Sequence, residues 1–177
     1  MVRSLVKKIL YTFIILLLTS CLGNNLQQAY QMSSEQFSQK TVVKRGTFNS
    51  GPTVESMILK DGLSSFFLRS TSKNVHVIYF YINYGEYLRP PGGGSSWIFY
   101  ENARLAGGKT LRMESVDRNH SCDSSCFFTE QSVIYVDPLN DNLNQIEVSG
   151  KNFRNPVIIQ FPSAYIQSHI NAVNTNF

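Results

Sequence analysis

Apolar residues in this chain occur in short blocks, and turn-forming residues separate one block from the next. The strongest block is residues 75–84, in which both alternating faces are mostly apolar or aromatic. A strand with two apolar faces is typical of the interior of a fold, where other elements cover it on both sides. We therefore predict a central strand over residues 75–84 that is packed on both faces.

The other blocks have the length and spacing of antiparallel strands. Asp61 and Gly62 predict a hairpin that joins residues 54–59 to residues 64–69. Residues 109–116 alternate between apolar and polar side chains, which is typical of a half-buried strand. Further strands are expected at residues 41–48, 97–100, 127–136, 146–148 and 157–161. The whole chain is thus expected to contain about eight strands.

A helix is expected at the end of the chain, and a short helix over residues 26–37 is the alternative to an irregular segment there. Ser163 can cap the C-terminal helix, and Ile166, Ile170 and Val173 then fall on one helical face. No helical pattern separates the strands, as a parallel α/β fold would require. The fold class that we predict is mainly β, an antiparallel β-sandwich or barrel-like domain with a short C-terminal helix.

The first 21 residues follow a different pattern. Arg3, Lys7 and Lys8 precede an apolar run at residues 9–18, which is too short to remain as a helix across a bilayer. Residues 18–21, with the sequence Leu-Thr-Ser-Cys, resemble the cleavage site of bacterial lipoprotein signal peptides. The resemblance implies cleavage before Cys21 and several acyl chains on its thiol and new amino group, which together anchor a protein durably. An ordinary signal peptide and an uncleaved anchor are the alternatives.

Cleavage would divide the chain into a signal peptide at 1–20, a lipidated flexible tether at 21–39 and one domain at 40–177. The tether is predicted because residues 22–39 are polar, with five glutamines and no periodic apolar pattern. A flexible chain of that length spans roughly 25 Å. Leu22 in place of Asp after the cysteine implies, by the same resemblance, an outer-membrane location facing the periplasm.

Cleavage also changes the charge. The whole chain has a formal charge of +4, but the leader contains three of its 16 Lys and Arg and none of its 12 acidic residues. The mature chain therefore has 13 basic and 12 acidic residues, a balance that does not favour nucleic acid. The expected partners are the membrane, through the lipid, and an envelope protein or peptidoglycan.

Two cysteines remain once Cys21 carries lipid. Cys122 and Cys126 lie four apart, and in an oxidising compartment a disulfide between them is the default expectation. His120 and Glu130 could complete a metal site with them, but a metal would need free thiolates. We therefore expect a disulfide and no metal.

Two short motifs match catalytic or nucleotide-binding patterns without their usual context. Residues 103–110 fit a relaxed phosphate loop, but the predicted continuation is a strand, and the envelope holds no ATP. Residues 70–73 read Ser-x-x-Lys, but the companion motifs of serine acylation are absent. His76, His120 and His169 lie in three separate elements and suggest no triad. We predict no nucleotide, no cofactor and no catalytic residue.

Aromatic residues around the Pro- and Gly-rich residues 89–96 are the remaining candidates for a binding surface. Their rings could stack on a glycan or anchor a protein, and core packing is the alternative. The residues are Tyr84, Tyr87, Trp97 and Tyr100. The predicted function is a non-catalytic binding or structural module of the envelope that makes contact through a two-stranded edge or residues 85–96. The alternatives are an envelope enzyme acting on a glycan and a phage- or plasmid-encoded lipoprotein that blocks a receptor.

Three stretches of the mature chain carry a further resemblance. They are Trp97-x-Phe99-Tyr100-x-x-Ala103, Cys122-x3-Cys126-x3-Glu130 and Pro162-x-Ala164-Tyr165-Ile166. Together they resemble small bacterial outer-membrane lipoproteins. The resemblance implies a fold and a location but no activity.

Overall fold

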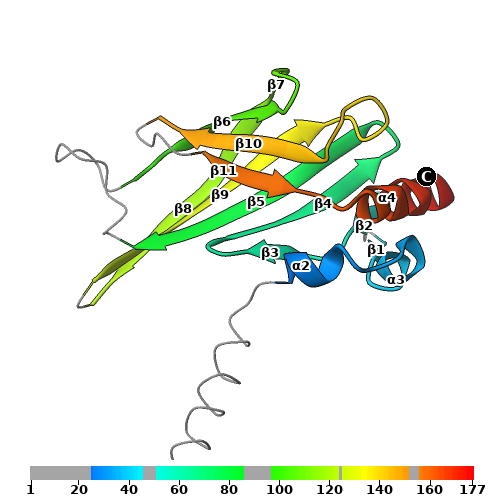
Figure 1. Cartoon of the computed structure of the whole chain (residues 1–177), viewed down its shortest axis with the longest axis horizontal. Coiled ribbons are helices and arrows are strands. Elements are labelled where there is room, and N and C mark those ends of the chain that lie inside the picture. Colours follow the sequence, from blue (N-terminus) through cyan, green and yellow to red (C-terminus); the bar gives the residue numbers. More distant parts are fainter. Residues whose placement is uncertain (1–24, 46–50, 86–96, 124, 152–155) are drawn as a thin grey trace, which may run out of the picture.

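The structure, a computed structural model, describes residues 25–45, 51–85, 97–123, 125–151 and 156–177. In these residues two antiparallel sheets are flanked by short helices near the N-terminus and by one C-terminal helix (Figure 1). The predicted mainly β fold with a C-terminal helix is confirmed. The sheets do not close into a barrel, so the sandwich-like alternative holds.

The large sheet has the strand order β1-β2-β4-β5-β9-β8, and β3 pairs with β4. Gly62, with φ +56°, forms the turn between β3 and β4, so the predicted Asp-Gly hairpin is confirmed. The longest strand pairs are β4 with β5 and β5 with β9, and the register of each is unbroken over most of its length. The strands of this sheet are β1 (Val42–Lys44), β2 (Thr53–Glu55), β3 (Leu59–Asp61), β4 (Ser64–Ser72), β5 (Val75–Gly85), β8 (Met113–Cys122) and β9 (Cys126–Val136).

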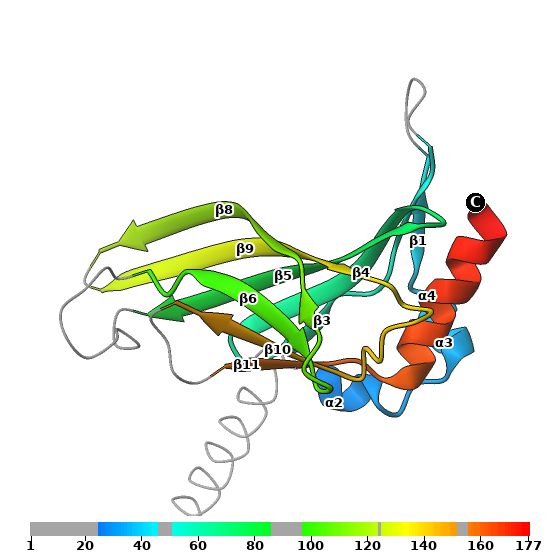
Figure 2. The same ribbon diagram turned by 90° about the horizontal axis from the view of Figure 1, so that it is seen from above.

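The small sheet has the order β11-β10-β6-β7 and lies over one part of the large sheet (Figure 2). Its strands are β6 (Tyr100–Leu105), β7 (Thr110–Leu111), β10 (Gln145–Gly150) and β11 (Val157–Gln160). Apolar side chains from both sheets fill the space between them and form one core. Its most completely buried members include Phe66, Leu68, Ile78, Ile134, Ile146 and Ile159.

The C-terminal helix α4 (Ser163–Asn176) packs on β2 and β4 of the large sheet, beside the small sheet. Its buried face contains Tyr165, Ser168, His169 and Val173, whereas Ile166 and Ile170, expected on that face, are only half-buried. Hydrogen bonds set this rotation: the Tyr165 hydroxyl accepts from the Leu68 amide at 3.1 Å and donates to a backbone carbonyl at 2.9 Å. Polar anchoring therefore determines which face of α4 is buried.

The predicted flexible tether is wrong for residues 25–39. These residues form α2 (Leu26–Ala29) and α3 (Ser34–Ser38) and belong to the domain. Leu26 and Phe37 are in the hydrophobic core, and Phe37 packs edge-on against the Tyr165 ring at 5.3 Å. The prediction failed because three apolar side chains, one of them Ala29, suffice to bury two short helices without giving a periodic pattern. Residues 21–24 lie outside the described part of the chain.

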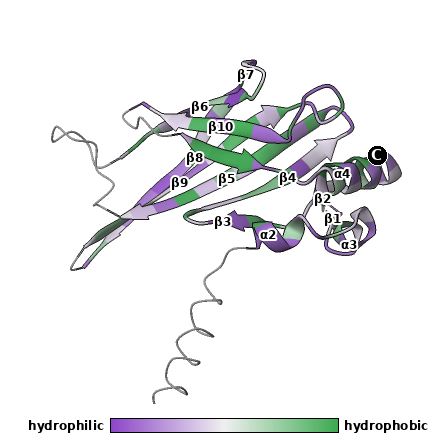
Figure 3. Cartoon of the chain, in the orientation of Figure 1, coloured by the Kyte–Doolittle hydropathy of each residue, from purple (hydrophilic) through white to green (hydrophobic). Residues whose placement is uncertain are grey.

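Strand β5 is central, as predicted, but only one of its faces is covered. His76, Ile78 and Phe80 point into the core, whereas Tyr79 and Tyr81 on the other face stay half-exposed. The small sheet and α4 both pack on the same side of the large sheet, so none of the described elements covers its outer face. Figure 3 marks the hydrophobic positions along the strands of the large sheet, with both faces of each strand coloured together.

Strands β8 and β9 extend past the rest of the large sheet as a hairpin arm (Figure 1). The disulfide between Cys122 and Cys126 closes the arm at its tip, which confirms the predicted pairing. Strand β8 is exposed along almost its whole length and forms an edge of the sheet. Within the described residues, no helix combines the length and the apolar character needed to cross a membrane.

Candidate binding surface

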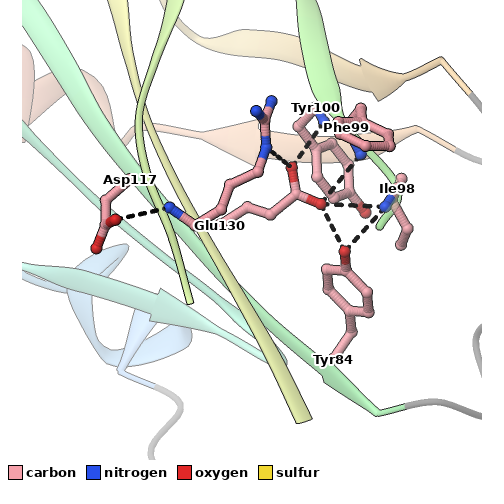
Figure 4. A network of polar contacts seen from close by, with 7 residues as sticks. Tyr84, Ile98, Phe99, Tyr100, Asp117 and Glu130 are labelled. Carbon is pink, nitrogen blue, oxygen red and sulfur yellow. Dashed lines mark hydrogen bonds and ion pairs between the residues drawn. The ribbon is translucent and has the colours of Figure 1, made fainter. Parts of the chain in front are cut away.

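A buried carboxylate, that of Glu130, lies where the arm meets the small sheet (Figure 4). Glu130 is 1% exposed, and five donors surround its two oxygens. Oε1 accepts hydrogen bonds from the Tyr84 hydroxyl at 2.5 Å, the Ile98 amide at 3.1 Å and the Phe99 amide at 3.0 Å. Oε2 accepts from the Tyr100 amide at 3.1 Å and from Arg118 Nε at 3.4 Å.

Glu130 holds the backbone at residues 98–100 in an unusual turn. Phe99 has φ +58°, a left-handed conformation that costs free energy in a residue other than glycine. The cost is offset because consecutive amides converge on one anion. Burial and the hydrogen bond to Glu130 raise the pKa of Tyr84 far above its ordinary value, so its hydroxyl stays a donor. The carboxylate is thus fully engaged in positioning the chain.

The structure corrects the predicted aromatic surface at two of its four residues. Tyr84 and Tyr100 are each 2% exposed and belong to the core, so their assignment to a surface is wrong. Core packing, the alternative, applies to both. Trp97 is half-buried and packs edge-on against Phe128 at 5.0 Å, while Tyr87 lies outside the described residues.

The outer face of the large sheet carries a set of aromatic side chains that sequence reasoning missed. Phe67, Tyr79 and Tyr81 are neighbours on β4 and β5, with nearly parallel rings whose centroids lie 5.2 to 6.4 Å apart. Beside them is a shallow depression of about 220 Å³. Arg69, Thr71, Val75, Val77, Tyr79, Val133 and Tyr135 line the depression. We call these residues, with Phe67 and Tyr81, the open face.

Two arginine–tyrosine pairs flank the depression. The guanidinium of Arg69 lies 5.3 Å from the Tyr79 ring centroid, and one of its nitrogens donates to the Tyr79 hydroxyl at 3.0 Å. On the other side, Arg112 lies 4.4 Å from the Tyr135 ring centroid. Each arginine also pairs with a glutamate, which limits its freedom and fixes the cation over the ring.

Both members of the second pair, Arg112 and Tyr135, bind the same carboxylate, that of Glu114. Arg112 donates to Glu114, and the Tyr135 hydroxyl donates to the same carboxylate at 3.0 Å. These hydrogen bonds, that of Arg112 first, lower the pKa of Glu114 below its ordinary value. The hydrogen bond to Glu114 in turn raises the pKa of Tyr135. The open face is therefore rimmed by charges that are already paired within the protein.

One signal in the sequence could have identified the open face. Along β5 the buried positions are hydrocarbon at Ile78, Phe80 and Ile82, whereas the intervening Tyr79 and Tyr81 carry hydroxyl groups. Tyrosine combines a large apolar ring with a polar hydroxyl group, so it suits a surface that is in contact with water when free and buried when a partner binds. In this middle part of β5 the two faces differ in polarity, a difference that a two-class hydrophobic pattern does not register; at the start of the strand the order is reversed, with His76 buried and Val75 and Val77 on the outer face.

A second buried network joins two serines and two histidines. Hydrogen bonds of 2.7 Å link Ser56 Oγ to His169 Nδ1, His169 Nε2 to Ser70 Oγ, and Ser70 Oγ to His76 Nδ1. His76 Nε2 lies 2.8 Å from the Lys73 carbonyl, which can only accept. That carbonyl makes His76 Nε2 a donor. With neutral imidazoles the other bonds then run in one direction: Ser70 donates to His76 Nδ1, His169 Nε2 to Ser70, and Ser56 to His169 Nδ1.

The serine–histidine network is closed to substrates. Ser70 and His169 have no exposed surface, and Ser70, the serine of the Ser-x-x-Lys match, already makes hydrogen bonds to both histidines. Lys73 is exposed and contributes only its carbonyl. The phosphate-loop match also has the predicted context, because strand β7 follows it where a nucleotide site needs a helix.

Among the described residues, no group of His, Cys, Asp and Glu side chains is arranged to hold a metal ion. Comparison with protein-family models, with curated proteins and with solved structures found no match to this chain.

Proposed function

We propose that this chain is a lipid-anchored protein of the bacterial cell envelope whose domain binds a protein partner without catalysing a reaction. The membrane is the outer membrane, and the domain faces the periplasm. The observation that carries the binding role is the open face, an aromatic and valine surface in the middle of the large sheet that no described element covers. Contiguous exposed apolar surface of this kind marks interaction sites.

A protein fits the open face better than a glycan does. Glycan binding needs a free ring face, but the rings of Phe67, Tyr79 and Tyr81 overlap one another, and Arg69 covers part of Tyr79. Tyrosine and arginine held rigidly around a small apolar depression are, in contrast, the side chains most enriched at the centres of protein interfaces.

The buried networks support a non-catalytic role. Glu130 has donors on both oxygens, and the hydroxyl of Ser70 is enclosed between two imidazoles. A general acid or a nucleophile must reach the substrate, and neither group has an exposed path. Both networks are accounted for by their effect on the fold.

The anchor is tested by Cys21→Ser in the full chain. The thiol is the only atom of that side chain that can form a thioether, so the variant should lack the diacylglycerol mass and leave the membrane fraction. Intact-mass spectrometry and fractionation of cells measure the two effects. A Cys21→Ser protein that remains lipidated and membrane-bound would contradict the anchor.

The open face is tested by a photo-crosslinking amino acid at Val77 in living cells. We expect a discrete adduct with one protein, because Val77 lines the depression. The same amino acid at Leu139, which is 68% exposed on another part of the domain, is the matched control and should give no such band. An identical adduct pattern at both positions, or none at Val77, would contradict binding through the open face.

A further inference from the structure

The domain begins very close to the proposed lipid. Asn25, the first described residue, is bound to β3 and to the residue before it by three hydrogen bonds. Its side chain donates to the Ile58 carbonyl at 2.9 Å and accepts from the Lys60 amide at 2.8 Å, and its own amide donates to the Lys60 carbonyl at 3.2 Å. Leu26, the next residue, is in the core, so the chain is fixed to the domain from this point.

The position of Asn25 limits how far the domain can stand from the membrane. Three residues separate Cys21 from Asn25. Even a fully extended chain covers no more than about 14 Å over these four steps. If Cys21 carries the lipid, as the proposed function states, the edge of the domain at α2 and β3 must lie at or next to the headgroups, since these occupy much of that distance.

Exposed apolar side chains gather at this same edge. Ile58 and Lys60 lie next to the bonds to Asn25, and Leu63 lies in the turn after β3. Tyr30 lies at the end of α2. Burial, and then the nearby carboxylate of Asp61, raise the pKa of the Tyr30 hydroxyl. Tyr30 is 52% exposed, and Ile58 and Leu63 are each 48% exposed. We call Tyr30, Ile58, Lys60 and Leu63 the α2–β3 patch.

We propose that the α2–β3 patch rests on the lipid bilayer and fixes the orientation of the domain on the membrane. Ile58 and Leu63 provide apolar side chains that can enter the headgroup region. Tyr30 provides an amphipathic ring of the kind enriched at membrane interfaces, and Lys60 an amine that can reach lipid phosphates. No charged residue occurs at 22–34, so the chain between the lipid and α3 adds no electrostatic cost of approach.

Figure 1 shows how this arrangement would display the rest of the molecule. The helix α2 and strand β3 lie together at the lower edge, and the loop between β9 and β10 lies at the upper edge. A domain seated on the α2–β3 patch therefore points that loop away from the bilayer. A freely tethered domain would show no such preference.

Fluorescence quenching in vesicles tests the seating. Ile58→Cys, Leu63→Cys and Leu139→Cys each add one free thiol, because Cys122 and Cys126 are joined in the disulfide. The mature lipidated proteins, produced from the full chain, are labelled with nitrobenzoxadiazole and reconstituted in vesicles of phosphatidylethanolamine and phosphatidylglycerol. A nitroxide lipid that carries its spin label near the headgroup serves as the quencher. We expect quenching at positions 58 and 63 at least about threefold stronger than at position 139.

The outcomes separate the seating from the anchor. Intact mass of each sample shows whether Cys21 carries lipid. A mass without lipid overturns the anchor and the seating together. A lipidated protein in which labels at positions 58 and 63 are quenched no more than the label at 139 overturns the seating alone.

Discussion

Glu130→Gln is expected to lower the free energy of unfolding by about 3 kcal/mol, the largest effect of any single substitution that we predict. The amide keeps the size of the side chain but replaces one acceptor oxygen with an NH2 group that faces backbone donors. It also removes the negative charge from among three backbone amides and Arg118. For a domain of this size the melting temperature should fall by roughly 6 to 12 °C.

Urea unfolding and calorimetry of the purified domain measure this loss. Glu114→Gln is the matched control, because Glu114 also pairs with an arginine but its side chain is 44% exposed. Exposed pairs of that kind contribute less than about 1 kcal/mol. Similar losses in the two variants would show that burial of Glu130 does not set the stability of residues 98–100.

Many of the strand positions could be predicted from the sequence because they coincide with short apolar blocks, but not all: β6 lies at Tyr100–Leu105 where a strand was expected at 97–100, and β8 continues to Cys122 as an exposed strand where a half-buried one was expected at 109–116. Leu59, Phe66, Ile78 and Ile134 all lie within such blocks, and all are fully buried. The disulfide was predictable for a similar reason, since two cysteines four residues apart fit a hairpin tip. Information within ten or so residues was sufficient in both cases.

Features that depend on distant partners could not be predicted. Nothing near Glu130 indicates that the amides of residues 98–100 will surround it, because the contact joins segments about 30 residues apart. The open face depends on which side of the large sheet receives α4 and the small sheet, and that is set by packing of the whole chain. Residues 25–39 appeared to be a linker because their burial rests on a partner, Tyr165, at the other end of the sequence.

Acidification should destabilise the domain through His169. Burial, and then the neighbouring His76, lower the pKa of His169 to about 4, whereas the unfolded chain has the ordinary value of 6.5. Between these values the unfolded state binds a proton that the folded state does not, so stability falls as the pH falls. The stability that the folded domain has with a neutral His169 is fully present above pH 6.5. It declines by about 2 kcal/mol at pH 5 and by about 3 kcal/mol once the pH is below 4.

The hydrogen bonds explain why the folded state resists this proton. A protonated His169 would have to donate from both ring nitrogens, and the hydroxyl of Ser56, which now donates to Nδ1, would have to reverse. Ser70 would still receive a bond from Nε2, but the charge would be enclosed among side chains with no exposed surface. Because His169 lies on α4, we expect that helix to loosen first.

Urea unfolding from pH 7 to pH 5 provides the test, since most carboxylates of the unfolded chain remain ionised over that range. His169→Asn should be less stable than the wild type at pH 7 but nearly independent of pH, so the difference between the two proteins should shrink by about 2 kcal/mol at pH 5. His120→Asn, at an exposed position on the arm, should keep the pH dependence of the wild type. If His169→Asn loses stability with the same slope as the wild type, the acid sensitivity resides in another group, and the buried serine–histidine network does not control it.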